Sequence, residues 1–306
     1  MTLGSLSFLL LLLLLHTPRS YSSEINERQG SSPKSDADLV EYPLDLAFLV
    51  AEFCLMGATG RGLDAFAPGL AQGGPPPVGG KMANLDPLTR NLSLQYGFIA
   101  VGHLRAIKRA VKGYPRPLLN ISKDLFAETL DHFFGQPLHP PFDPYANSMN
   151  YRIACYIVTL VAPSAYAGII PKLQNTTSKE LVAGLLGVAS GIETSNRAYL
   201  FEHQEWLVAP YTISVAEFTD RISEGANKLG KAGSKSEGIV VPPSQGAEGR
   251  VAGNVIEADK DSLTNGRDPE ETLRIVYGSG DERVPGGFYP KGGNSRIAKH
   301  YLDSMP

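Results

Sequence analysis

The chain has 306 residues, of which 42% are hydrophobic and 19% charged, and its formal net charge is −3. That length suffices for one large domain or for two smaller ones, each with its own buried core. The slight acidic excess argues against a nucleic-acid-binding protein, which needs clustered basic residues. Two cysteines are too few for a disulfide-rich scaffold or a zinc motif.

The N-terminus is typical of a secretory signal. Leucines fill most positions from Leu6 to Leu15, and Pro18 and a serine-rich stretch follow. The pattern predicts a signal peptide over residues 1–22, cleaved near Ser22, and therefore a secreted protein. The alternative is a membrane anchor, but the run is too short to cross a bilayer of about 30 Å, so we expect no transmembrane anchor. Cleavage would remove one basic residue, Arg19, and leave a net charge of −4.

Residues 23–41 are rich in Ser, Lys, Glu, Asp and Gln, which predicts a flexible leader. In a secreted protein, three sequons further along are candidate N-glycosylation sites, although chance matches are the alternative for so short a motif. Their asparagines are Asn91, Asn120 and Asn175. Asn120 and Asn175 fall at junctions between predicted elements, whereas Asn91 lies early in a predicted helix and must face outward to be used.

The first long helix is predicted over residues 44–57, where Asp45 and Glu52 are the only charged residues. A helix that is apolar all round is buried on every side. Glu52 then needs a partner, because an unpaired buried carboxylate is costly. The segment 57–82, rich in glycine and proline, cannot continue the helix.

A second helix is predicted to begin after Asp86, a favourable N-cap, with Pro87 at its first position. Apolar residues and His103 then recur at helical spacing until Gly113. The position three residues before His103 is Ala100. A Glu-x-x-His pair on one helical face is a ligand pattern of di-metal helical bundles, and here its carboxylate is missing.

Three more helices complete the predicted bundle. A short one covers residues 123–134, and a longer one carries Ile153 and Tyr156 on its apolar face until Pro163 bends or ends it. The last begins at Thr177, with Glu180 at capping-box spacing, and extends to about residue 206. Four long apolar helices without convincing strand pairs predict an all-α four-helix bundle over residues 42–210.

After residue 210 the composition changes. Residues 214–229 and 269–277 predict helices, and the remainder consists of glycine, proline and polar residues with little core. We expect residues 211–306 to form a helix and an extended, partly irregular segment that wraps the bundle.

The two cysteines, Cys54 and Cys155, fall on separate apolar helices. In an oxidising compartment they could form one inter-helix disulfide, and the alternative is that each is a small buried hydrophobic residue. The sequence does not give the distance between them, so both alternatives stay open.

The chain resembles the plant desiccation-related proteins that carry a ferritin-like domain, from about Tyr42 to its end. The segments that carry the resemblance are AEF (51–53), GGPPP (73–77), ANLDPLT (83–89), VGHLRAIK (101–108), PPFDPYANS (140–148), KELVAGLLGV (179–188) and VPGGFYPKGGN (284–294). The resemblance implies a ferritin-like bundle, an extracellular location in the apoplast or cell wall, and expression linked to water deficit or seed maturation. It implies no established catalytic activity.

The same resemblance places the metal-ligand positions of the fold. The first-helix glutamate falls on Glu52 and the second-helix histidine on His103. Two glutamate positions are replaced by Ala100 and Ala189, and a polar position by Ile192. A third-helix carboxylate would fall near Thr159. Glu193, one turn after Ala189, could lean into the gap or lie on the surface.

A di-metal centre draws on about four carboxylates and two imidazoles, so Glu52, His103 and Glu193 indicate at most a vestigial metal site. Glu52 and His103 could instead satisfy each other as a buried pair. The leading hypothesis is a secreted, non-catalytic glycoprotein without a cofactor, which binds or protects something in the cell-wall space. The alternatives are an iron- or manganese-binding oxidoreductase or storage protein, and an extracellular interaction module whose C-terminal segment meets a partner.

Overall fold

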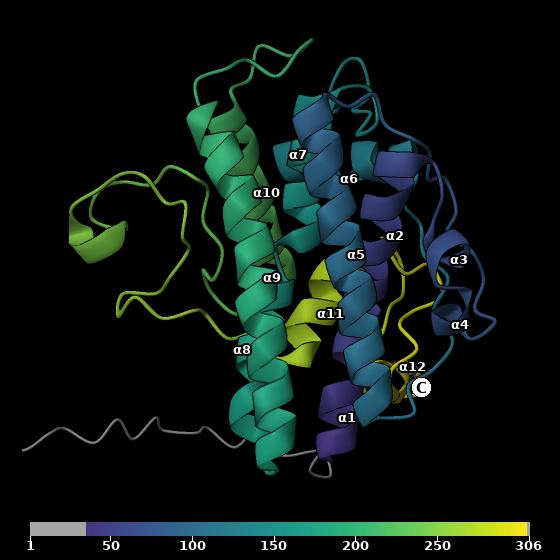
Figure 1. Ribbon diagram of the computed structural model, residues 1–306. Coiled ribbons are helices and arrows are strands. Elements are labelled where there is room, and N and C mark those ends of the chain that lie inside the picture. The colour runs from purple at the N-terminus through teal and green to yellow at the C-terminus, as the bar shows by residue number, and fades with distance from the viewer. Residues whose placement is uncertain (1–34, 305–306) are drawn as a thin grey trace, which may run out of the picture. The chain divides into compact units, whose positions relative to one another are not determined.

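A bundle of long α-helices, covered on one side by C-terminal segments, accounts for residues 35–304, the part of the chain that the computed structural model describes (Figure 1). The bundle helices are α2 (Pro43–Thr59), α5 (Pro87–Ala110), α7 (Ser148–Thr159) with α8 (Ala162–Ile169), and α9 (Thr176–Glu202). Within residues 35–304, β pairing is limited to isolated bridges such as that between Val78 and Asn120. The predicted all-α bundle is confirmed. The signal peptide expected at residues 1–22 lies outside the described residues.

The helix boundaries follow from local chemistry. The carboxylate of Asp86 caps α5 by accepting from the Thr89 N–H at 2.8 Å, as the sequence predicted. The helix is interrupted between α7 and α8, just before Pro163, because the proline ring would clash with the carbonyl group four residues earlier in a continuous helix. The cap expected at Thr177 is wrong: the side chain of Asn175 caps α9 by accepting from the N–H groups of Thr177 and Ser178. That helix ends at Glu202, one turn before the expected end near residue 206.

The predicted leader, 23–41, is corrected at its end. Residues 36–41 form a short helix, α1 (Asp36–Glu41), with a capping box between Ser35 and Asp38. Leu39 and Val40 on this helix are buried. Through these two residues the short helix packs against the core, although the polar composition around them suggested an unstructured segment. Residues 23–34 lie outside the described part of the chain.

Further helices surround the bundle. They are α3 (Leu63–Phe66), α4 (Pro68–Ala71), α6 (Lys123–Phe134), α10 (Val215–Gly230), α11 (Pro269–Tyr277) and α12 (Arg296–Leu302), with 3-10 turns at Ile170–Lys172 and Ala247–Gly249. The sequence predicted α6 and α11 to the residue. Because Leu273, Tyr277 and Tyr289 are almost completely buried, the segment after residue 210 contributes directly to the core.

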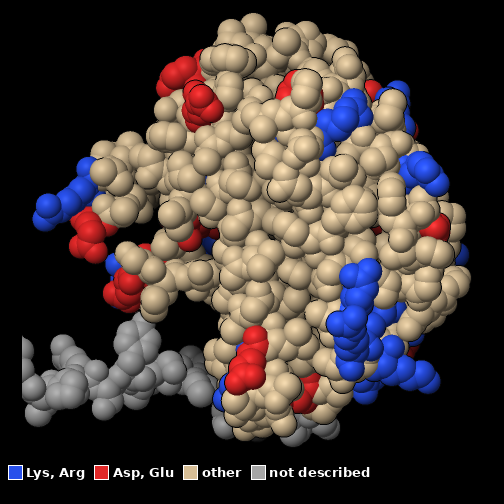
Figure 2. Space-filling view, in the orientation of Figure 1, with Lys and Arg blue, Asp and Glu red and all other residues tan. Residues whose placement is uncertain are grey.

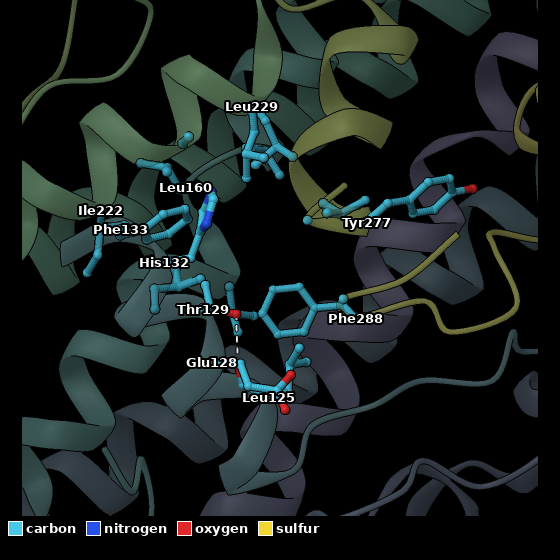
Figure 3. Close-up of a pocket in the computed structure, with 18 of the residues that line it drawn as sticks. Leu125, Glu128, Thr129, His132, Phe133, Leu160, Ile222, Leu229, Tyr277 and Phe288 are labelled. Atoms are coloured by element: carbon cyan, nitrogen blue, oxygen red, sulfur yellow. Dashed lines mark hydrogen bonds between the residues drawn. The ribbon is translucent and has the colours of Figure 1, made fainter. Parts of the chain in front are cut away.

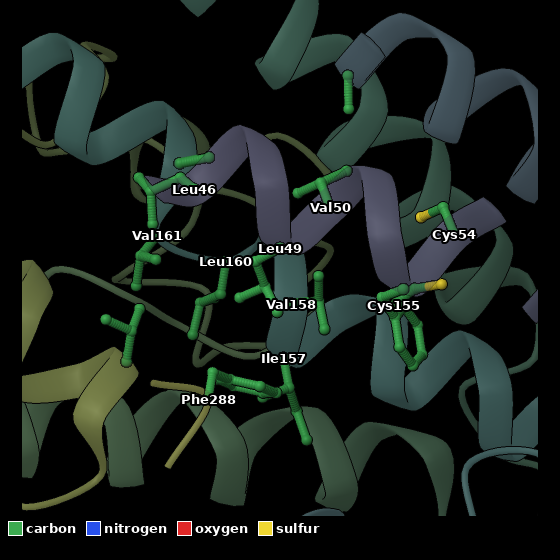
Figure 4. Close-up of a cluster of buried hydrophobic side chains, with 14 of the residues drawn as sticks. Leu46, Leu49, Val50, Cys54, Cys155, Ile157, Val158, Leu160, Val161 and Phe288 are labelled. Atoms are coloured by element: carbon green, nitrogen blue, oxygen red, sulfur yellow. The ribbon is translucent and has the colours of Figure 1, made fainter. Parts of the chain in front are cut away.

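The centre of the core lies where α2 faces α7. Leu49 on α2 lies beside Val158 and Leu160, and the two cysteines come together further along the same interface (Figure 4). Both cysteines are free thiols and fully buried, so the disulfide that the sequence left open is not formed. Contact with Cys155, reinforced by burial, raises the pKa of Cys54 well above its usual range.

One stretch of the described residues, Ser148–Lys172, is long and apolar enough to cross a membrane. Of its most apolar window, 83% is buried inside the bundle. Its apolar composition is therefore explained by its position in the core of the bundle.

The surface made by α5 and α9 is poor in charge along most of its length (Figure 2). Basic side chains gather near the C-terminal end of α5, where cations favour the helix dipole. Arg105, Lys108 and Arg109 belong to this group. One member is tied to the protein itself, since the Lys108 ammonium donates to the carbonyl of Tyr114 at 2.7 Å.

Candidate metal centre

A small cavity of about 20 Å³ lies at the middle of the bundle, with room for about one water molecule. All four bundle elements contribute to its wall. The lining residues are Ala47, Val50, Ala100, His103, Thr159, Ala162, Tyr166, Ala189 and Ile192. The pairs Ala100/His103 and Ala189/Ile192 have the i, i+3 spacing that places two side chains on one helical face. This cavity is therefore the place where a four-helix bundle would hold a di-metal centre.

The donor atoms at the cavity do not fit two metal ions. His103 supplies an imidazole, whose pKa is lowered by burial. Thr159 supplies a hydroxyl, which already donates to the carbonyl of Cys155 at 2.9 Å. The other lining residues are aliphatic apart from Tyr166, and none is a carboxylate. One imidazole and two hydroxyls fall far short of four carboxylates and two imidazoles.

Glu52 does not line this cavity, which corrects the position expected for the first-helix ligand. Its carboxylate forms a buried ion pair with the guanidinium of Arg116 and accepts from the Leu63 N–H at 3.0 Å. Burial raises the pKa of Glu52, and the neighbouring Arg116 opposes that rise. The pair with His103 that the sequence suggested is therefore replaced by a pair with Arg116.

Helix geometry explains the correction. Residues on an α-helix are separated by about 100°, so Glu52 lies about 200° around α2 from Val50, which does line the cavity. Because α2 is buried on all sides, its sequence carries no apolar stripe that would have shown which face meets the other helices.

The Glu52–Arg116 pair fastens the glycine- and proline-rich loop to the bundle. Arg116 also donates to the carbonyls of Pro75, at 2.7 Å, and Gly74, at 3.0 Å, and forms an ion pair with Asp64 at 2.8 Å. A Cβ atom at Gly74 would overlap the backbone of Arg116, so glycine is required there. Arg116 was not among the residues predicted from the sequence. The available signal was an arginine between two prolines, 115 and 117, in an otherwise apolar stretch.

Glu193 turns away from the cavity as well. It is buried on α9 beside Arg197, Glu257 and a second small cavity of about 50 Å³. Its Oε1 atom has no hydrogen-bond partner among residues 35–304. Burial and the nearby Glu257 raise the pKa of Glu193 to about 8. The three candidate ligands therefore do not converge, and no group of three or more His, Cys, Asp or Glu side chains in the described part of the chain is placed to hold a metal ion.

The three sequon asparagines differ in exposure. Asn91 is exposed on the outer side of α5, and Asn175 is exposed at the start of α9. Asn120 is half-buried, and its side-chain oxygen accepts from the Ser122 N–H at 3.0 Å. Whether any of them is glycosylated stays a prediction.

Four helices that meet around a common centre, two of them with an i, i+3 pair facing it, are typical of the ferritin-like class of bundle. The model of the ferritin-like domain family matches residues 35–202. A ferritin-like catalase, Nec2, from Nesocodon mauritianus is 50% identical over 269 residues, which cover 88% of this chain and 86% of that protein. The desiccation-related protein PCC13-62 from Craterostigma plantagineum is 46% identical over 272 residues, 89% of this chain and 87% of the relative. No solved structure matches significantly.

The chain therefore belongs to the ferritin-like domain family, among the plant desiccation-related proteins.

Proposed function

We propose that this chain is a secreted, non-catalytic ferritin-like protein that acts during desiccation or a related water-deficit stress. The relative named as desiccation-related supports the stress role. The leucine-rich N-terminus and the three sequons support secretion into the apoplast or cell wall. In this role the bundle is a stable scaffold that binds or protects an extracellular component.

The observation that carries the non-catalytic assignment is the lining of the central cavity. Alanine stands at 100 and 189, where the fold places carboxylate ligands, and His103 is the one strong metal donor in the wall. Glu52 and Glu193 are held elsewhere, by Arg116 and beside Glu257 respectively.

The second candidate is an iron- or manganese-dependent oxidoreductase or a metal-storage protein. It is favoured by one observation, the 50% identity to a protein named as a ferritin-like catalase. Such an activity in this chain would need a metal site built around His103, because the other two candidate ligands do not reach the cavity.

Metal content and peroxide decomposition decide between these candidates. The protein is purified from a secretory host without chelators, its iron and manganese are measured, and oxygen release from hydrogen peroxide is followed. His103→Ala is the matched variant. We expect only trace metal and the same oxygen release from both proteins. Near-stoichiometric iron or manganese that His103→Ala loses would overturn the proposal.

A gain-of-site variant tests the same conclusion from the other direction. Ala100→Glu combined with Ala189→Glu and Ile192→His adds three donors around His103. We expect the metal-free variant to be less stable than the wild type, because unpaired carboxylates become buried. Manganese should then raise its melting temperature, through preferential binding to the folded state, and leave the wild type unchanged. A wild-type protein that manganese stabilises equally would contradict the proposal.

A further inference from the structure

A much larger cavity, of about 280 Å³, lies between α6, α10 and α11, with α7 forming its floor (Figure 3). It is separate from the central cavity, since no residue lines both. It is open to solvent at the edge where Glu128 and His132 are exposed. A cavity of this size approaches the range of about 300–1,000 Å³ found for small-molecule sites.

The packing of the surrounding helices keeps the cavity open. Phe134 on α6 meets Phe218 on α10 edge to face, with ring centroids 5.0 Å apart. Phe133 rests directly on Gly225 of α10, where any Cβ atom would overlap its ring. These contacts fix α6 against α10. Leu229 on α10 and Ile275 on α11 then face α6 across the space.

The wall is apolar except along α6. Leu160, Ile222 and Leu229 supply aliphatic surface, and the ring of Phe288 points into the space, whereas the Tyr277 hydroxyl points away from it (Figure 3). That hydroxyl accepts from the Gly293 N–H at 2.9 Å and is not available to a ligand.

The polar edge consists of Glu128 and His132, one turn apart on α6. Both are exposed at the cavity, in contrast to the buried Ile222 and Ala226 opposite. The neighbouring Thr129 hydroxyl is already used, because it donates to the carbonyl of Leu125 at 2.8 Å. The cavity thus combines an aromatic and aliphatic interior with one carboxylate and one imidazole at a single edge.

We infer that this cavity binds a small, neutral aromatic alcohol or phenol. The ring lies against Phe288 and Phe133, because aromatic pairs favour stacked or edge-to-face contacts. The hydroxyl group of the ligand donates to the Glu128 carboxylate and lies near His132, at the same edge of the cavity. An anionic ligand is disfavoured by Glu128, and a long-chain lipid is too large for the volume. The inference does not depend on whether the protein binds metal.

The test uses three probes with one ring and different polar ends: benzyl alcohol, toluene and benzoate. Binding is measured by saturation-transfer NMR and by methyl chemical shifts in protein labelled at Ile, Leu and Val. We expect affinity in the order benzyl alcohol, toluene, benzoate, with the first at least tenfold above the last. Methyl shifts should concentrate at Val158, Leu229 and Ile275. Val50 and Ile192, at the central cavity, serve as the internal control and should not shift.

Filling the cavity should abolish binding. Ala226→Phe places a ring in the space from α10, and we expect at least a tenfold loss of affinity for benzyl alcohol and toluene. Ala198→Phe, exposed on α9, is the matched control and should bind as the wild type does. If Ala226→Phe fails to fold, Leu229→Trp at the cavity wall replaces it, and the methyl shifts in the wild type locate the site without any substitution.

The polar edge is tested by Glu128→Ala combined with His132→Ala. This variant should lose the preference for benzyl alcohol over toluene while still binding toluene. The inference is overturned if benzoate binds as tightly as benzyl alcohol, if the filled variant retains wild-type affinity, or if the methyl shifts fall outside this cavity or do not occur.

Discussion

Glu193 is a buried carboxyl group whose ionisation opposes the packing of residues 237–257 against α9. Arg197 holds that segment by donating to the carbonyls of Gly238, at 3.0 Å, and Glu237, at 3.1 Å. Glu193 lies beside Glu257, so the ionised forms of the two carboxyl groups repel each other, and burial raises the pKa of both.

This arrangement predicts a falling stability with rising pH. The pKa of Glu193 is about 8 in the folded protein, against 4.5 as its ordinary value, so its favourable contribution is complete below pH 4.5 and is lost as pH rises towards about 8. Glu193→Gln should reduce this dependence, with only the part due to Glu257 remaining, and should raise stability above pH 8 by several kcal/mol, at about 1.4 kcal/mol per pKa unit. Urea unfolding between pH 5 and pH 9 measures how the free energy of unfolding depends on pH.

The matched control for that experiment is Glu180→Gln, an exposed position on the same helix. It should reproduce the wild-type pH profile. A Glu193→Gln profile parallel to the wild type would show that Glu193 ionises freely in the folded protein.

Arg116 gives a second prediction at the residue scale. Arg116→Met leaves Glu52 buried without its cation and frees the loop that Arg116 holds through Pro75 and Gly74. We expect a loss of about 3–5 kcal/mol in the free energy of unfolding. Arg116→Met together with Glu52→Gln should recover part of this loss, because no unpaired charge remains. Arg105→Met, on the exposed end of α5, should have little effect, and an equal loss there would refute the interpretation.

The residues show why the bundle was predictable and its centre was not. His103 and Thr159 were expected near the ligand positions and do line the cavity. For His103 the reason is that α5 has a polar and an apolar face, which fix its orientation. Glu52 was misplaced because α2 is buried all round and carries no such pattern. The partner of Glu52 is 64 residues away and that of Arg197 about 60, and sequence periodicity says nothing about contacts of that range.

At the scale of elements, local signals decided how well each helix was predicted. Both ends of α6 and of α11 carry a residue typical of a helix cap. These residues are Ser122 and Gly135 for α6, and Asp268 and Gly278 for α11. For α9, Asn175 and Thr177 are both good caps, and the choice between them depends on Asp36, whose carboxylate accepts from the Asn175 N–H at 2.7 Å. Such a contact between α1 and α9, which are far apart in the sequence, cannot be predicted from local sequence patterns.

The interface between α2 and α7 gives a prediction for the two cysteines. Both thiols are fully buried, and contact between them together with burial raises the pKa of Cys54 well above its usual range. Thiolates are the reactive species, so native protein should not react with iodoacetamide at pH 8. Both cysteines should react once urea unfolds the chain. Intact mass before and after alkylation measures this, and rapid labelling of native protein would show that the interface opens.

At the scale of the whole molecule, the C-terminal segment and the bundle share one core. Tyr289 is fully buried, and its hydroxyl donates to the carbonyl of Asp45 on α2 at 2.8 Å. The Asp45 carboxylate accepts in turn from the Asn294 N–H at 3.0 Å. Sequence composition suggested a wrapping segment with little core of its own, and that description missed how far its few apolar residues reach into the bundle.

Deleting residues 231–306 should therefore abolish cooperative folding. Among the buried side chains that the deletion removes are four large ones, Leu273, Tyr277, Phe288 and Tyr289. Burial of each large apolar side chain contributes about 1.5–3 kcal/mol, and their sum is comparable with the entire stability of about 5–15 kcal/mol typical of a protein. Calorimetry should show no sharp transition for this truncation. Removing only residues 303–306, after the end of α12, should leave the melting temperature unchanged. A truncated bundle that melts cooperatively within a few degrees of the full chain would instead show that the segment is a separable module, free to meet a partner.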